Sequence, residues 1–220
     1  MTSEAKILHL AELRQALARF PTVPSPTVQA WEMGWPALDN RGPLHRAEVT
    51  ELCSRPALGS LFLHQVFAAI RRRREFAALI DCGRTFDPDS FRDAALDRLL
   101  CVACEKAEHA VKAADLLLRD GNLPLVLLDL QALPRRSLGR IPANTWHRFQ
   151  RLVEKSGTVF IVLTPQPIVE AARLRIALRG RWPLAALSRS RSELLATLDV
   201  QAFHRGRGAR WNAEPIEKTA

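Results

Sequence analysis

From residue 46 onward, short apolar runs alternate along the chain with amphipathic segments. Apolar runs of this length predict buried strands, and apolar positions three or four residues apart predict helices. The predicted strands are Ala47–Cys53, Ala77–Asp81, Leu99–Cys104, Leu125–Leu130 and Val159–Thr164. The predicted helices lie near residues 62–74, 88–96, 106–119 and 143–155. Because each crossover is long enough to return the chain to a parallel neighbour, we expect an α/β fold with a mostly parallel, twisted sheet flanked by helices.

The pattern changes after Thr164. Leu174–Leu178 and Leu194–Phe203 both favour strands, and Pro183 lies between them together with serine–arginine repeats. We expect these two C-terminal strands to extend the sheet as antiparallel pairs.

The first residues predict a separate element. Apolar side chains at Ile7, Leu10, Leu13 and Leu17 have helical spacing, and a proline-rich linker follows at Pro21–Pro26. Such a helix can lie on its own domain or reach a neighbouring molecule, and the sequence does not choose between them. The chain is therefore divided into an N-terminal helix and linker (residues 1–26), one core domain (residues 27–211) and a tail expected to fray (residues 212–220).

The charge balance indicates the kind of partner. Lys and Arg number 32 and Asp and Glu 23, so the net charge is +9 at pH 7. A balance of this sign favours polyanionic or acidic partners, although it says nothing about the fold.

The four cysteines, Cys53, Cys82, Cys101 and Cys104, lie in or beside apolar runs and do not have the spacing of a disulfide framework. This is typical of a cytoplasmic protein. Cys101 and Cys104 form a C-x-x-C pair with no second pair, which favours core packing over a metal site. The apolar runs are too short to cross a bilayer, so we expect no membrane span.

One stretch has the order of a nucleoside-triphosphate site: a strand at Ala47–Cys53, a turn at Ser54–Leu61 and a helix after it. The phosphate loop G-x-x-x-x-G-K-[ST] needs glycine, lysine and a hydroxyl residue where this chain has Ser54, Ser60 and Leu61; only Gly59 matches. Asp129 ends the run L-V-L-L-D, where a Walker B aspartate would hold magnesium. The alternative role of Asp129 is to close the strand and cap the next turn.

Three ordered segments carry a family resemblance. Gly34–Leu52, Ala78–Pro88 and Glu108–Asp129 resemble, in turn, the entry to the phosphate loop, the strand-end aspartate with its D-P pair, and the helix before the Walker B strand of the RecA-type recombinase core. The resemblance runs from about Gly34 to Leu178 and implies a RecA-like P-loop core. Where the family has its catalytic glutamate, this chain has Gly83, and Pro165 stands where the family has a nucleotide-sensing glutamine.

These departures remove the groups that would stabilise a transferring phosphoryl group, so we expect negligible hydrolysis and no cofactor. Pro56 also removes a backbone donor from the loop, and Ser54 cannot freely adopt positive φ. The resemblance thus indicates a pseudo-ATPase and not an enzyme.

Basic side chains are the candidates for DNA or partner contact. Arg135, Arg136 and Arg140 correspond by position to the first DNA-binding loop of the recombinase, and the second loop is truncated to Pro167–Glu170. A solvated surface loop is the alternative. A further basic surface is expected near the C-terminus, from Arg173, Arg175, Arg205, Arg207 and Arg210, with a role in solubility as the alternative.

Among RecA relatives, degenerate ATP motifs, similar length and an arginine-rich C-terminal part are features of the ImuA-type (SulA-like) mutagenesis proteins, which this chain resembles. The resemblance implies a nucleoid-associated adaptor in the SOS response and in translesion DNA synthesis. Its partners would be an ImuB-like inactive Y-family polymerase, an error-prone replicative-type polymerase, RecA, single-stranded DNA or further copies of itself. Two alternatives remain: an ATPase of unconventional site, supported by Gly59 and Asp129, and an inhibitor of cell division.

Overall fold

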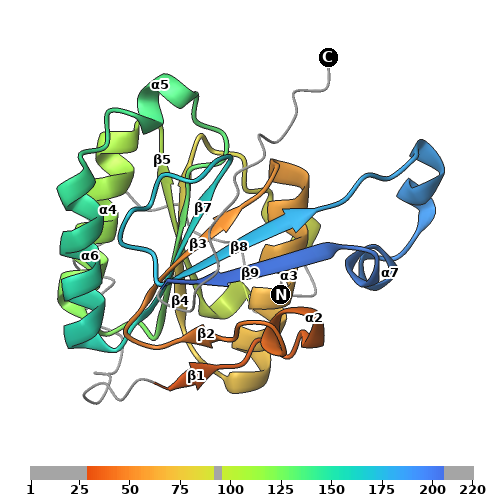
Figure 1. Cartoon of the computed structure of the whole chain (residues 1–220), viewed down its shortest axis with the longest axis horizontal. Helices are drawn as coiled ribbons and strands as arrows, with labels where there is room; N and C mark the ends of the chain where they lie inside the picture. The colour runs from red at the N-terminus through yellow and green to blue at the C-terminus, as the bar shows by residue number, and fades with distance from the viewer. Residues whose placement is uncertain (1–28, 92–95, 206–220) are drawn as a thin grey trace.

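The computed structural model describes residues 29–91 and 96–205 and contains a sheet of seven strands. Their spatial order is β5-β4-β6-β7-β3-β8-β9, and every adjacent pair is parallel except β8 with β9 (Figure 1). The bounds are β3 (Val49–Cys53), β4 (Ala77–Cys82), β5 (Leu99–Cys104), β6 (Leu125–Asp129), β7 (Val159–Thr164), β8 (Leu174–Arg179) and β9 (Asp199–His204). The expectation of an α/β fold with a mostly parallel sheet is confirmed.

Helices cover both faces of this sheet (Figure 1). Helix α3 (Pro56–Arg73) lies on one face, and α4 (Ala107–Asp120) with α6 (Ala143–Ser156) lies on the other. The shorter helical elements are α2 (Pro36–Asp39), η1 (Pro88–Phe91), η2 (Leu96–Arg98), α5 (Arg135–Leu138), η3 (Leu184–Ser188) and α7 (Arg191–Ala196). A small antiparallel pair, β1 (Ala30–Trp31) with β2 (Leu44–His45), joins the α3 side.

Each face of the sheet packs its own hydrophobic core, which is why the central strands are continuous apolar runs. On the α3 side, Leu52, Leu127 and Ile161 pack against the helix together with Trp31 and Met33. On the other side, α4 and α6 pack against the alternate strand positions, such as Val126, Val162 and Phe160. All four cysteines are free and buried, with Cys101 in the first of these layers and Cys82 and Cys104 in the second.

Three of the five strands predicted before Thr164 differ from the structure at one end, and the second of them only extends by one residue, to Cys82. The first begins at Val49 and not at Ala47, because Ala47 has φ 64° and its left-handed conformation cannot continue a strand. The Gln150 amide holds this entry, accepting from Val49 N at 3.1 Å and donating to Ala47 O at 3.1 Å. The strand predicted to end at Leu130 ends at Asp129, which turns the chain out of the sheet.

The helix predicted near residues 88–96 is wrong in its described part. The chain there makes two single 3₁₀ turns, η1 and η2, and residues 92–95 lie outside the described structure. Asp87 accepts from Asp89 N and from Ser90 Oγ, contacts that favour a tight turn over a helix interior.

The C-terminal strands differ from the prediction as well. β8 pairs parallel with β3, and only β9 is antiparallel, to β8. The strand predicted from Leu194 is in fact helix α7 up to Ala196, because Ser190 and Glu193 form a capping box that starts a helix. The predicted N-terminal helix and linker, Arg207, Arg210 and the tail at 212–220 lie outside the described residues.

The connection between β8 and β9, residues 180–198, projects from the body as an arm (Figure 1). Its base is held by Trp182 Nε1, which donates to Thr197 Oγ1 at 2.9 Å, and by Arg191, which donates to Ser90 O. Near its end Leu184 is 86% exposed.

Within residues 29–91 and 96–205, none of the helices combines the length and the apolar character needed to cross a bilayer.

Candidate functional site

The candidate site lies at the carboxyl edge of the sheet, where the adjacent strands β4 and β6 end at Asp81 and Asp129, and β3, separated from β6 by β7, ends next to Ser54. The turn predicted at residues 54–61 is wrong, because α3 begins already at Pro56. Arg55 has φ −72° and ψ 153°, an extended conformation, and proline at the first helical position has a φ preset for the helix. Only Ser54 and Arg55 therefore connect the strand to the helix.

A glutamine that follows β6, two strands away from β3, fills the position beside this connection. Gln131 Nε2 donates to Ser54 O and to Ser54 Oγ, each at 2.8 Å, and both residues are buried. A Cβ atom at Gly59 would lie 2.0 Å from Gln131 Oε1. Gly59 is thus required for the close approach of Gln131 to α3, which gives this glycine a packing role.

The other residues aligned with the phosphate loop lie inside the helix. Ser60 is exposed and donates to Pro56 O at 3.3 Å, and Leu61 is 8% exposed and joins the α3-side core. In this geometry the backbone N–H groups of residues 60 and 61 point along the helix and cannot surround a phosphate. The arrangement lacks the open loop on which triphosphate binding depends.

Two aspartates stand at the ends of β4 and β6. Asp81 accepts from Thr85 N at 3.1 Å and from Phe86 N at 2.9 Å, and Asp129 Oδ1 accepts from Gln131 N at 2.9 Å. Burial raises the pKa of Asp129 to about 7, with Asp81 adding to the rise and the Gln131 N–H opposing it. Both carboxylates stabilise the turns after their strands.

Gly83, which the sequence resemblance aligns with a catalytic glutamate of the RecA-type recombinases, has φ 114°. A Cβ atom there would lie 2.8 Å from the Cβ of Ala132. A glutamate could occupy this position only with a changed backbone, because φ in this range is strained for every residue with a side chain. The local conformation therefore favours glycine at this position.

A cavity of about 320 Å³ opens beside these residues. Its walls come from the start of α3, the β4–η1 segment, the end of β6 and α7. The lining residues are Pro56, Ala57, Ser60, Leu61, Leu63, Thr85, Phe86, Asp87, Ser90, Phe91, Asp129, Gln131 and Arg191. Within the described ranges, no group of three or more His, Cys, Asp or Glu is placed to hold a metal ion.

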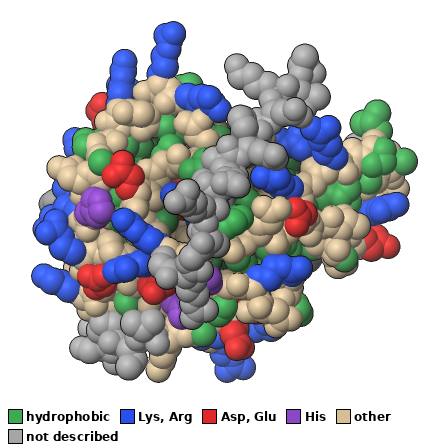
Figure 2. All heavy atoms as spheres, in the orientation of Figure 1, with side chains coloured by type: hydrophobic (Ala, Val, Ile, Leu, Met, Phe, Trp, Pro, Cys, Tyr) green, Lys and Arg blue, Asp and Glu red, His purple; other side chains and the backbone are tan. Residues whose placement is uncertain are grey.

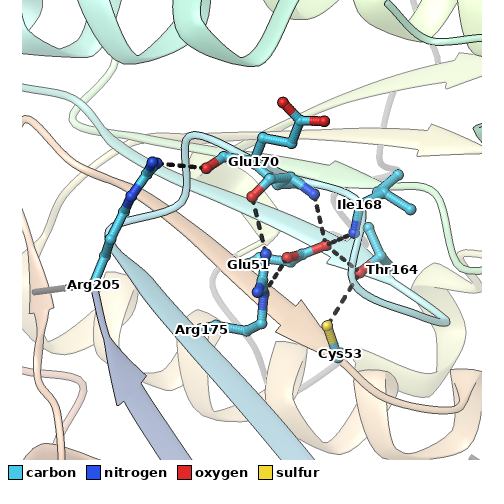
Figure 3. Close-up of polar contacts among 8 residues, drawn as sticks. Glu51, Cys53, Thr164, Ile168, Glu170, Arg175 and Arg205 are labelled. Atoms are coloured by element: carbon cyan, nitrogen blue, oxygen red, sulfur yellow. Dashed lines mark hydrogen bonds and ion pairs between the residues drawn. The ribbon is translucent and has the colours of Figure 1, made fainter. Parts of the chain in front are cut away.

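A second polar cluster lies deeper in the sheet, around the carboxylate of Glu51 in β3 (Figure 3). Glu51 is fully buried, and Arg175 Nε in β8 donates to it at 2.6 Å. Its other oxygen accepts from Thr164 Oγ1 at 3.1 Å, Ile168 N at 2.7 Å and Val169 N at 3.1 Å. The charge is thus compensated by one cation and three further donors, the condition under which a carboxylate can be buried.

This cluster fixes the segment between β7 and β8, where the sequence placed a truncated second DNA-binding loop. Arg175 Nη2 also donates to Val169 O at 3.0 Å, and Arg205 donates to Glu170 O at 2.7 Å (Figure 3). Arg175 in β8 and Arg205 after β9 therefore both hold this segment against the sheet. Arg175 was expected on a basic surface face, but its side chain is 23% exposed and belongs to the buried pair.

The remaining candidate arginines fall on two opposite edges of the sheet. Arg135, Arg136 and Arg140 follow β6 and are exposed at the carboxyl edge, and Arg140 also lines a cavity of about 570 Å³ beside α4. Arg173 precedes β8, and Arg205 follows the antiparallel β9, so both lie at the amino edge. Figure 2 shows Lys and Arg side chains spread over several elements of the visible face and not gathered in one stripe.

Sequence reasoning missed Glu51, Gln131 and Arg191. A signal existed for Glu51, since a carboxylate inside the apolar run A-E-V-T-E-L-C needs a buried partner. Gln131 and Arg191 gave none, because their partners, Ser54 and Ser90, are distant in the sequence.

The cysteines have no features of a reactive site. Burial raises the pKa of Cys53 and of Cys101 to about 12, and that of Cys104 to about 11. Such thiols remain protonated at neutral pH and are poor nucleophiles.

Glu51→Gln should lower the free energy of unfolding by about 3 kcal/mol, because it leaves the Arg175 guanidinium without its counter-charge. Urea denaturation of the purified variant measures this. Adding Arg175→Met should recover part of the loss. Arg173→Met is the matched control, since its ion pair with Glu154 is a 3.8 Å contact between exposed side chains, and it should change stability by less than about 0.5 kcal/mol. Equal effects of Glu51→Gln and Arg173→Met would contradict the role of the pair.

Gly59→Ala should destabilise the protein by about 1–2 kcal/mol, because the new methyl group displaces the Gln131 amide from Ser54. In a Gln131→Ala background the same change should stabilise by about 0.5–1 kcal/mol, the ordinary gain of alanine over glycine in a helix. A double-mutant cycle measured by thermal and urea unfolding tests this change of sign. A destabilisation of the same size in both backgrounds would show that Gln131 does not set the requirement for glycine.

Asp129→Asn should stabilise the protein at pH 8 by on the order of 1–3 kcal/mol and should have little effect at pH 4. Because the folded-state pKa of Asp129 is raised to about 7, its favourable contribution is complete below pH 4 and is lost as the pH rises through 7. The difference in unfolding free energy between variant and wild type, measured from pH 4 to pH 8, should grow with pH. Asp120→Asn, an exposed site, is the control; a pH-independent difference for Asp129→Asn would refute the assignment.

Two comparisons with known proteins complete the description of the site. No protein-family model matches the chain, and no curated protein matches it. The comparisons assign it to no family, so the geometry of the carboxyl edge is the basis for any functional conclusion.

Proposed function

We propose that this protein is a non-catalytic, RecA-like adaptor of the DNA-damage response that recruits or regulates an error-prone polymerase complex during translesion synthesis. One observation carries the non-catalytic part. Helix α3 begins two residues after β3, and Gln131 packs against it at Gly59. The space that a nucleotide's phosphates would need is filled by the chain's own helix and side chain.

The electrostatics of the edge support the same conclusion. Asp87 and Asp129 line the cavity, and the lysine and hydroxyl positions of a phosphate loop hold Ser60 and Leu61. Phosphoryl transfer depends on cations and positioned donors around the transferring group. Here a triphosphate would face two carboxylates and one guanidinium, that of Arg191, without a lysine, so both binding and turnover are disfavoured.

The adaptor part of the proposal rests on the sequence resemblance and on charge. The fold is compatible with a RecA-like core, and the net charge of +9 favours acidic or polyanionic partners. Exposed Arg135, Arg136 and Arg140 at the carboxyl edge are separated from Arg173 and Arg205 at the amino edge. Two cationic surfaces of this kind suit an adaptor that contacts different partners, such as a polymerase and single-stranded DNA, at different edges.

The proposal predicts that the purified full-length protein hydrolyses no ATP above the background of a heat-inactivated sample, with or without single-stranded DNA. Binding of a fluorescent ATP analogue with magnesium should be undetectable at micromolar protein, because no loop surrounds the phosphates. A pull-down with the purified ImuB-like and replicative-type polymerases should recover a complex in buffer free of nucleotide.

Turnover at an ordinary motor-enzyme rate would favour the alternative ATPase, and Asp129→Asn would then abolish it. A complex that forms only with ATP would also exclude the adaptor mechanism as stated. If neither a polymerase complex nor turnover is observed, the non-catalytic part of the proposal stands and the proposed partners are refuted.

A further inference from the structure

The cavity at the carboxyl edge has aromatic and acidic walls. Phe86 and Phe91 stack with their ring centroids 5.2 Å apart and their planes 29° apart, and Phe67 meets both rings edge-on behind them. Asp87 stands beside these rings, and Asp129 comes from the end of β6. Aromatic faces carry negative electrostatic potential, so rings and carboxylates favour the same sign of ligand.

Apart from the Arg191 guanidinium, hydrogen-bond acceptors dominate the polar lining. Asp129 uses Oδ1 for Gln131 N, and Gln131 uses its Nε2 group for Ser54, which leaves its Oε1 as the atom facing α3. The hydroxyl groups of Ser60 and Thr85 donate within the chain, to Pro56 O and to Asp81, and so present lone pairs to the cavity. A ligand with several donors fits such a lining better than an anion does.

The chain itself supplies one example of this chemistry. The guanidinium of Arg191, on the arm, lies 5.7 Å from the centroid of the Phe91 ring and donates to Ser90 O. A planar cation therefore already packs against the aromatic wall, and the cavity of about 320 Å³ remains beside it. This volume is near the lower limit of small-molecule sites and suits one charged head with a short stem, not a nucleoside triphosphate.

We propose that this cavity is a binding site for an organic cation, a guanidinium or ammonium group, which donates to the carboxylates of Asp129 and Asp87 while its stem packs on Phe86. In triphosphatases the start of the corresponding helix binds phosphate anions, whereas the cavity at this place in the present chain favours a cation. The source of the cation is a free solute of the arginine or polyamine type, or an arginine or lysine side chain of a peptide. The site does not depend on the polymerase partners of the proposed function.

The geometry also implies a pH dependence. Asp129 is faced by Asp81 and Cys82 from β4, by the Gln131 N–H on its own segment, and by Asp87 and Arg191 around the cavity. Its pKa is raised to about 7, mainly by burial. A bound cation stabilises the ionised carboxylate, so cation affinity should rise between pH 6 and pH 8, and binding should release a proton.

The test is a titration of the full-length protein with methylguanidinium, argininamide and putrescine, followed by calorimetry and by amide chemical shifts at pH 6 and pH 8. Methylurea, the neutral isostere of methylguanidinium, is the matched ligand control and should not bind. Asp129→Asn should weaken binding by about tenfold or more and remove its pH dependence, since it removes a charge-assisted hydrogen bond. Asp87→Asn should weaken binding as well, and Asp120→Asn, on an exposed helix end, should leave it unchanged.

A second variant tests whether the cation binds in this cavity and keeps both carboxylates and the aromatic rings in place. Ser60→Arg adds a guanidinium to an exposed position on the rim of the cavity, and it should block methylguanidinium binding while the protein stays folded. Equal binding of methylurea, unchanged affinity in both Asp129→Asn and Ser60→Arg, or no binding of any of the three cations would overturn the proposal.

A further titration distinguishes the two sources of the cation. An alanine–arginine–alanine peptide, blocked at both ends, should bind at least as tightly as argininamide if the natural occupant is a protein side chain, and should be excluded if it is a free solute. ATP is titrated separately. Its binding would contradict the non-catalytic function, whereas failure of the cations alone would contradict only this inference.

Discussion

The side-chain amide of Gln131 connects the three elements on which the carboxyl edge depends. It links the end of β6 to Ser54 at the end of β3, and it lies against α3 at Gly59. With α3 held there from Pro56 onward, Leu58, Leu61 and Phe62 face the core, and a loop of the phosphate-binding kind has no room to form. One buried hydrogen-bonded amide thus accounts for the packing of the edge and for the small size of its cavity.

The buried carboxylate of Glu51 is the second constraint. The chain passes from β7 to β8, both parallel to β3, through a segment without helix or strand. Such a crossover has unsatisfied backbone groups, and Glu51 accepts from two of them, Ile168 N and Val169 N. Arg175 completes the arrangement from β8. The position of β8, and with it that of β9 at the edge, therefore follows from a charge pair in the middle of the sheet.

The sequence was sufficient for the parts of the fold that depend on local pattern. Apolar runs located strands β3 to β7 to within two residues at each end. The start of α3 was missed because a glycine was taken for a loop residue, when its role is set by a side chain distant in the sequence. The direction of β8 and the burial of Arg175 were missed for the same reason, since both depend on Glu51 across the sheet.

The arm at residues 180–198 leaves and rejoins the sheet at a single rung, where Arg179 of β8 is the register partner of Asp199 of β9. Some of its contacts are internal, such as Trp182 with Thr197 and the Ser190–Glu193 capping box, whereas Arg191 and Leu195 of α7 hold it to the body. The outer part of the arm, where Leu184 is exposed, can therefore vary without changing the register of β8 and β9, whereas α7 is constrained by the body on which it packs.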